Sequence, residues 1–152
     1  MSLFCSETSG DSFGMKILMY LYNQDVRLRE RYNKFNPVAL VREAEKHIGH
    51  DQAKCLTKLA EGGFNRVFLL RMEDGFEAIV KIPYHIPGPK HFATASEAAT
   101  LHCLRCNGIP VPEVYGYSSE SNPAGVEYIA MEKAPGVGLE RRWSSMSKRE
   151  RH

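Results

Sequence analysis

The stretch that most constrains the fold runs from Leu59 to Pro83 and reads LAEGGFNRVFLLRMEDGFEAIVKIP. Its apolar parts are rich in branched and aromatic residues, which favour β-strands. The glycine pair Gly62–Gly63 interrupts the stretch once, and Asp74-Gly75 supplies a typical hairpin turn. We therefore expect three consecutive antiparallel strands, at residues 55–60, 66–72 and 76–82.

The rest of the chain adds helices and two more strands. Asn36 can cap the helix predicted at 37–48, Pro37 suits its first position, and Gly49 ends it. A second helix is predicted at 94–105, and further strands are predicted at 114–117 and 126–131. The pattern indicates an α+β fold with a five-stranded antiparallel sheet, one main helix and a preceding helical extension.

Composition excludes several classes of function. The net charge is +2 and the basic residues are scattered, so we expect no nucleic-acid partner. No run approaches the roughly 20 apolar residues that cross a bilayer, so no membrane span is expected. Cys103 and Cys106 form a C-x-x-C without a second ligand pair at zinc spacing, so we expect no metal site.

The glycine pair allows a ligand to approach the backbone closely, because no Cβ intervenes. Free N–H groups at Gly62 and Gly63 could point at phosphate oxygens, and the nearby Asn65 could add a donor. The alternative is a plain turn, which a glycine pair marks more often.

Lys81 lies in the apolar segment AIVKIP, where a cation needs a reason. The alternation of a strand places it on one face with Ile79, opposite Val80 and Ile82. It is either a solvated surface lysine or a lysine that holds nucleotide phosphates.

Glu97 is the natural counter-charge for Lys81, since it is the first acid of the following helix. Thr94 and Glu97 also fit a capping box, in which Glu97 would only satisfy the start of that helix. The pattern leaves both roles open. The segment Met131-Glu132-Lys133 follows the fifth strand, at the position where a kinase connects its lobes and binds adenine; the alternative is a simple strand end.

Several ordered motifs together resemble the aminoglycoside phosphotransferase and choline-kinase-like superfamily: LAEGGFNRVFLL, AIVKIP, TASEAATL, GIPVPEVYGYSS, NPAGVEYIAMEKAPGV and WSSMS. More narrowly, the chain resembles the fungal branch that includes altered inheritance of mitochondria protein 9. The likeness covers residues 20–152, and the segment at 21–36 is similar to that branch's N-terminal extension.

The resemblance implies a protein-kinase-like N-terminal lobe at 53–134. A poorly ordered segment at 1–20 and a helical extension at 21–52 would precede the lobe, and a linker with the start of a second lobe would follow at 135–152. The implied ATP-binding residues are Gly62, Gly63 and Asn65 at the phosphates, Lys81 with its partner Glu97, and Met131, Glu132 and Lys133 at the adenine.

A kinase of this type also needs a catalytic aspartate and a later aspartate that holds Mg²⁺. No aspartate follows Asp74 in this sequence. We therefore expect a fragment that lacks the C-lobe, with weak or lost ATP binding and no phosphotransfer of its own. Mg²⁺ and transfer of the γ-phosphate to a small-molecule hydroxyl would belong to an intact parent protein.

Two other interpretations stay open. The lobe could be a non-catalytic binding or regulatory module that docks a protein partner on its uncovered face, or an unrelated α+β domain. The resemblance implies a mitochondrial location. The first 14 residues do not read as a transit peptide, which leaves the cytoplasm as the alternative.

Overall fold

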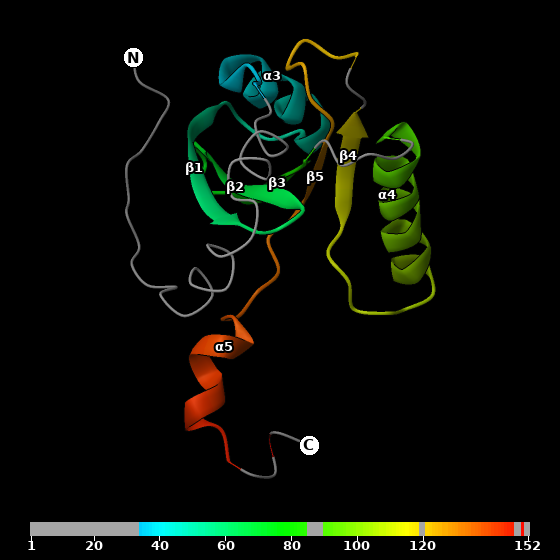
Figure 1. Cartoon of the computed structure of the whole chain (residues 1–152). Helices are drawn as coiled ribbons and strands as arrows, with labels where there is room; N and C mark the ends of the chain where they lie inside the picture. The colour runs from blue at the N-terminus through cyan, green and yellow to red at the C-terminus, as the bar shows by residue number, and fades with distance from the viewer. Residues whose placement is uncertain (1–33, 85–89, 119–120, 148–149, 151–152) are drawn as a thin grey trace, which may run out of the picture.

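The computed structural model describes residues 34–84, 90–118, 121–147 and 150. The predicted poorly ordered segment 1–20 and the start of the predicted extension, 21–33, lie outside this part of the chain. Figure 1 shows a sheet with α3 near one end, α4 along one side and α5 apart from both. The elements are α3 (Pro37–Ile48), β1 (Ala53–Glu61), β2 (Asn65–Met72), β3 (Glu77–Pro83), α4 (Lys90–Cys106), β4 (Val114–Ser118), β5 (Tyr128–Glu132), α5 (Leu139–Arg142) and the 3₁₀ turn η1 (Trp143–Ser145).

The five strands form one antiparallel sheet in the order β1-β2-β3-β5-β4. The predicted α+β fold with a five-stranded antiparallel sheet and one main helix is therefore confirmed. In the sheet, β5 lies between β3 and β4. The chain therefore leaves β3, passes through α4 to β4 at the far edge, and then returns as β5. β1 carries two register shifts, at Ala53/Cys55 and Lys58/Ala60, and β4 carries one at Val114/Gly116.

Helix α3 begins and ends where its sequence predicts. The Asn36 side chain accepts hydrogen bonds from the backbone N–H groups of Val38 (3.1 Å) and Ala39 (3.2 Å). Pro37 follows at the first helical position, and Gly49 ends the helix in the left-handed region at φ 70°. These local interactions define both ends, so α3 does not depend on distant contacts for its length.

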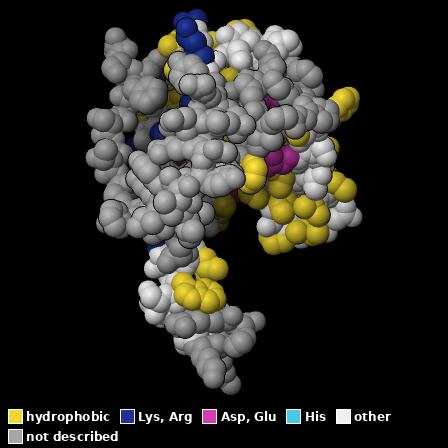
Figure 2. Space-filling model, in the orientation of Figure 1, with side chains coloured by type: hydrophobic (Ala, Val, Ile, Leu, Met, Phe, Trp, Pro, Cys, Tyr) yellow, Lys and Arg dark blue, Asp and Glu magenta, His cyan; other side chains and the backbone are white. Residues whose placement is uncertain are grey.

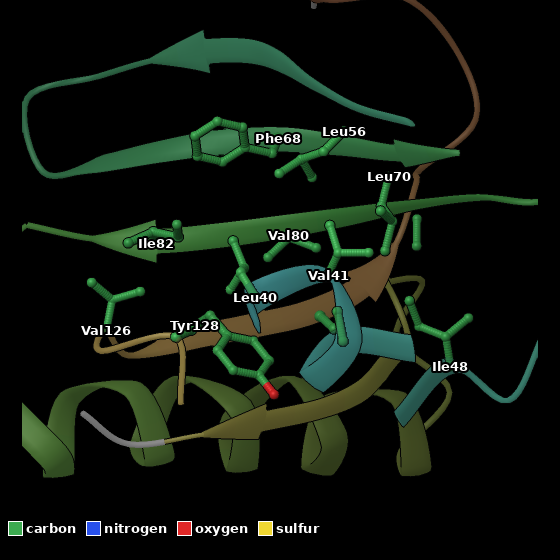
Figure 3. Packing of buried hydrophobic residues seen from close by; sticks show 14 of the residues in the cluster. Leu40, Val41, Ile48, Leu56, Phe68, Leu70, Val80, Ile82, Val126 and Tyr128 are labelled. Atoms are coloured by element: carbon green, nitrogen blue, oxygen red, sulfur yellow. The ribbon is translucent and has the colours of Figure 1, made fainter. Parts of the chain in front are cut away.

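The core lies between α3 and one face of the sheet. Leu40 and Val41 of α3 point toward the strands that carry Val80 and Leu70 (Figure 3). Tyr128 of β5 belongs to the same buried cluster. In β3, Ala78, Val80 and Ile82 are fully buried on this face. The predicted alternation of β3 is therefore confirmed, and Lys81 lies on the opposite face.

Helix α4 begins at Lys90, earlier than the predicted start at 94. Thr94 is buried inside the helix, where its hydroxyl donates to the buried carboxylate of Glu127. A tertiary partner has therefore replaced the local capping role that the sequence suggested for Thr94. The helix packs mainly against β4, at the edge of the sheet.

Strand β5 is shorter than predicted at its start. Val126 is buried but precedes the strand, because its C=O accepts a hydrogen bond (2.7 Å) from the Asn122 side chain. Asn122 also accepts from the N–H groups of Ala124 (2.9 Å) and Gly125 (3.1 Å), which closes a turn ahead of β5.

The C-terminal segment contains two short helical elements. α5 and η1 occupy residues 139–145, within the segment 135–152 predicted as a linker and the start of a second lobe, and Met146 and Ser147 are not helical. Ser145 donates its hydroxyl to the C=O of Arg142 (2.9 Å), a local bond of the kind that competes with helix continuation. Among the described helices, none has both the length and the apolar character needed to cross a membrane.

Candidate functional site

Lys81 projects from the middle of β3 on the face opposite the core. It lies beside Val67 of β2 and Ile129 of β5, which are its register partners. Its Nζ lies 2.5 Å from the Glu97 Oε1 on α4, and the Lys81 side chain is 22% exposed. The structure therefore brings these two predicted residues into contact.

The contact decides between the two roles that the sequence left open for Glu97. Because α4 begins at Lys90, Glu97 lies about two turns inside the helix and cannot cap its N-terminus. The capping-box interpretation is wrong, and the predicted ion pair is present. Its role in nucleotide binding stays a prediction.

The ion pair is only partly shielded, with 41% of the Glu97 side chain exposed. Exposed ion pairs of this kind contribute about 0–1 kcal/mol to folding. The main effect of the pair is therefore positional, since it holds the Lys81 ammonium over the sheet face opposite the core.

The glycine turn, residues 61–64, joins β1 to β2. The Gly62 N–H donates to the C=O of Asn65 (2.9 Å), so this N–H closes the turn and is not free for a phosphate. The prediction of a free N–H at Gly62 is wrong for this reason. A Cβ placed on Gly63 would meet nothing within 4 Å, so open space adjoins the turn there.

The base of the glycine turn is held by Tyr84, the residue after β3. Its N–H donates to the Phe64 C=O (2.8 Å), and its hydroxyl donates to the Glu61 carboxylate, which Lys58 also contacts. Burial works to raise the pKa of Glu61, but hydrogen bonds from Lys58 and Tyr84 outweigh it and lower the pKa. Glu61 therefore stays ionised within this set of contacts.

The predicted adenine hinge, Met131 to Lys133, lies at the end of β5. Met131 pairs with Ile79 in register, so it shares the Lys81 face, and it is 9% exposed. The Glu132 N–H donates to the C=O of Glu113 (2.7 Å), and Lys133 contacts the Glu77 carboxylate. The polar groups of Glu132 and the ammonium of Lys133 thus already have partners within the fold.

The glycine turn, Lys81 and the predicted hinge lie along a diagonal across the sheet. The glycine turn lies at the end of β3 where Asn65 pairs with Pro83, two residues from Lys81, or about 7 Å along the strand. The hinge lies one strand across, toward the other end of β3, where Glu132 pairs with Ala78. Lys81 therefore lies between the turn and the hinge.

Sequence reasoning missed a set of charged contacts around the hinge. Arg105 of α4 contacts the carboxylates of Glu113 and Glu132, at 3.1 Å each. On the other side, hydrogen bonds from Lys133 and then Arg71 lower the pKa of Glu77. No local pattern could show these contacts, because 27 residues separate Arg105 from Glu132 and 56 separate Glu77 from Lys133.

Metal ligands do not gather in the part of the chain that the structure describes: no group of three or more His, Cys, Asp or Glu residues could hold an ion there. Cys103 and Cys106 are both exposed free thiols near the end of α4. Cys106 Sγ lies 3.6 Å from Nε2 of His102.

Comparison with known proteins gives fungal relatives. A subtelomeric hrmA-associated cluster protein of Aspergillus fumigatus is 52% identical over 99 residues, which cover 64% of this chain and 19% of the relative. Part of this chain is homologous to that protein. The mitochondrial protein named altered inheritance of mitochondria protein 9 is 33% identical in Candida tropicalis, over 71% of this chain and 18% of the relative. Its Komagataella phaffii namesake is 31% identical, over 61% and 16%.

The chain thus spans about a fifth of the length of these relatives. The predicted likeness to altered inheritance of mitochondria protein 9 is confirmed over this partial region. No family model matches the chain. No solved structure matches it either. Membership of the kinase-like superfamily therefore stays a prediction.

Proposed function

We propose that this chain is the nucleotide-binding lobe of a phosphotransferase related to the aminoglycoside and choline kinases. Its intact parent would transfer the ATP γ-phosphate to a small-molecule hydroxyl. The observation that carries the proposal is the contact between Lys81 and Glu97. In protein kinases, a strand lysine held by a helix glutamate contacts the α- and β-phosphates.

The arrangement around the pair supports this assignment. The triphosphate would lie between Lys81 and the open side of Gly63, where a Cβ would meet nothing within 4 Å. The adenine would lie toward Met131, on the same face of the sheet. Asn65 is the first residue of β2, beside the turn. Glu132 and Lys133 would contribute their backbone, and not their side chains, to the hinge.

The chain supplies only part of the chemistry that phosphoryl transfer needs. No aspartate follows Asp74 in the sequence, so no later aspartate of this chain could serve as the catalytic base or the Mg²⁺ ligand of a kinase. We expect weak ATP binding by this chain, with a dissociation constant of about 1 mM, and no phosphotransfer. The missing groups would belong to the larger part of the parent protein.

An NMR titration of the ¹⁵N-labelled chain with Mg²⁺·ATP tests the proposal, since chemical shifts detect millimolar affinity. We expect saturable shifts at the amides of Gly63, Lys81 and Met131. Lys81→Met should abolish them, while Lys54→Met, at an exposed lysine on β1, should leave them unchanged. Equal shifts in wild type and Lys81→Met would overturn the assignment.

A non-catalytic docking module is the second candidate, and exposed apolar side chains favour it. Phe64 is 71% exposed at the glycine turn, and Val137, Leu139 and Trp143 are exposed around α5. Figure 2 shows hydrophobic side chains at the lower right of the main body and on the α5 segment. A docking module of this kind would bind a protein partner and show no ATP-dependent shifts.

We also propose a mitochondrial location, with the cytoplasm as the alternative. The support is the printed name of two relatives, which describes those proteins as mitochondrial. Fractionation of cells that express the tagged natural gene product tests this, and recovery in the cytosolic fraction alone would contradict it.

A further inference from the structure

Arg105, near the end of α4, joins three separate parts of the chain. Its Nη1 donates to the C=O of Val111 (2.9 Å) and to the Glu132 Oε2 (3.1 Å). Its Nη2 donates to the Glu113 Oε2 (3.1 Å). A guanidinium has a rigid planar fork of donors, so two of its nitrogens reach these three acceptors at once, whereas an ammonium would have to serve all of them from one nitrogen.

Glu113 and Glu132 are also bonded to each other through the backbone. The Glu132 N–H donates to the C=O of Glu113 (2.7 Å), and the Glu113 N–H donates to the Glu132 Oε2 (3.0 Å). These bonds extend the pairing of β4 with β5 up to the last residue of β5. Both carboxylates contact the Arg105 guanidinium at 3.1 Å, so Arg105 supplies a positive charge to each.

Helix α4 therefore contacts the candidate site at two places. Glu97 meets Lys81, and Arg105 meets Glu132 at the hinge. The two residues are eight positions apart, a rise of about 12 Å along the helix. One rigid element thus sets the position of the lysine and the position of the hinge relative to each other.

We propose that Arg105 is a positioning residue for the adenine end of the nucleotide, an inference that rests on the proposed function. Arg105 does not touch the nucleotide. It fixes the end of β5, so that the hinge backbone and Met131 hold one arrangement. Without it, the carboxylates of Glu113 and Glu132 repel each other, and the hinge loses its attachment to α4.

The test separates the two ends of the ligand. Adenosine reports on the hinge alone, and inorganic triphosphate reports on Lys81 and the glycine turn. Both are titrated by NMR into wild type, Arg105→Gln, Lys81→Met and Arg42→Gln. Arg42 is an exposed arginine on α3, so its variant matches the change of charge away from the site.

Arg105→Gln should weaken adenosine binding roughly fivefold, equivalent to about 1 kcal/mol, and leave triphosphate binding unchanged. Lys81→Met should show the reverse, and Arg42→Gln should match wild type. Equal adenosine affinity in wild type and Arg105→Gln overturns the inference and leaves the proposed function standing. Absence of binding of both probes to wild type overturns the proposed function and the inference with it.

Hydrogen exchange supplies a second readout that needs no ligand. In Arg105→Gln, the Glu132 amide should exchange faster, while amides in the β2–β3 pair keep their protection. Arg105→Lys should restore the net charge but not the adenosine affinity, because lysine carries its donors on one nitrogen, whereas Arg105 contacts its acceptors through two separate nitrogens. Uniformly faster exchange across all strands would show a general loss of stability and would overturn the positioning role.

Discussion

Gly116→Ala tests the packing that places α3 on the sheet. The register shift in β4 turns Gly116 toward α3, and a Cβ there would lie 2.3 Å from the His47 Cγ and 2.4 Å from its Nδ1. It would also lie 2.8 Å from the His47 Cβ, whereas carbon atoms in contact are about 3.5–4.0 Å apart. Rotation of the His47 ring cannot relieve the last contact, so the helix itself must move.

Overpacking of this kind costs about 1–3 kcal/mol. Alanine also reduces the entropy of the unfolded chain, which offsets about 0.4–1 kcal/mol. We therefore expect the free energy of unfolding to fall by about 1–2 kcal/mol, which lowers Tm by roughly 2–8 °C for a chain of 152 residues. Urea denaturation followed by circular dichroism measures the free energy of unfolding, and a thermal melt followed by the same signal measures Tm.

Two further variants make the result interpretable. Gly63→Ala is the matched control, because a Cβ there meets nothing within 4 Å, and its stability should stay within about 0.5 kcal/mol of wild type. His47→Ala removes the two ring atoms nearest to the new Cβ, so Gly116→Ala should cost less in that background. An equal cost in both backgrounds would refute the contacts with the His47 ring as the cause, since alanine retains the His47 Cβ.

Three other outcomes follow from single residues. Asn36→Ala removes the cap of α3 and should lower the free energy of unfolding by about 1 kcal/mol, while Asn36→Ser should retain most of it; urea denaturation measures both. Leu40→Ala empties a fully buried position in the core and should cost about 3 kcal/mol in the same assay, and a cost under 1 kcal/mol would contradict the packing described for α3. Hydrogen bonds from the Phe76 N–H and then from His50 lower the pKa of Asp74 below its usual value of 3.8. A carboxyl whose pKa is lower in the folded state stabilises the protein above the unfolded pKa, and this contribution disappears as the pH falls through the folded value. The free energy of unfolding of wild type and of Asp74→Asn should therefore be measured from pH 7 to pH 2. Wild type should be more stable at neutral pH, and the difference should shrink below pH 3.8. A difference that stays constant with pH would contradict the assignment.

Elements set by local chemistry could be predicted from the sequence. Helix α3 matches its expected bounds because Asn36, Pro37 and Gly49 define both ends within a few residues. The face of Lys81 also followed from the sequence, since the alternation of β3 is a local property. The start of α4 could not be predicted, because Thr94 and Glu97 imitate a capping box while their side chains contact Glu127 and Lys81.

The candidate site was predictable only in part, for the same physical reason. Lys81 stands out as a cation in an apolar strand, and Glu97 as the first acid of the next helix. Arg105 has no such local mark, since its acceptors come from the loop before β4 and from the end of β5. The hydrogen bond from the Gly62 N–H to the Asn65 C=O depends on the geometry of the turn, which a pair of glycines in the sequence does not specify.

The irregular register of β1 has a consequence for the protein in solution. β1 is an edge strand, and an edge with unpaired N–H and C=O groups is a template for growth into aggregates. The shifts at Ala53/Cys55 and Lys58/Ala60 interrupt its regular hydrogen-bonding pattern, and Lys54 and Lys58 add exposed positive charges. Like charges on two approaching copies repel each other, so we expect these features to disfavour pairing of β1 edges between molecules.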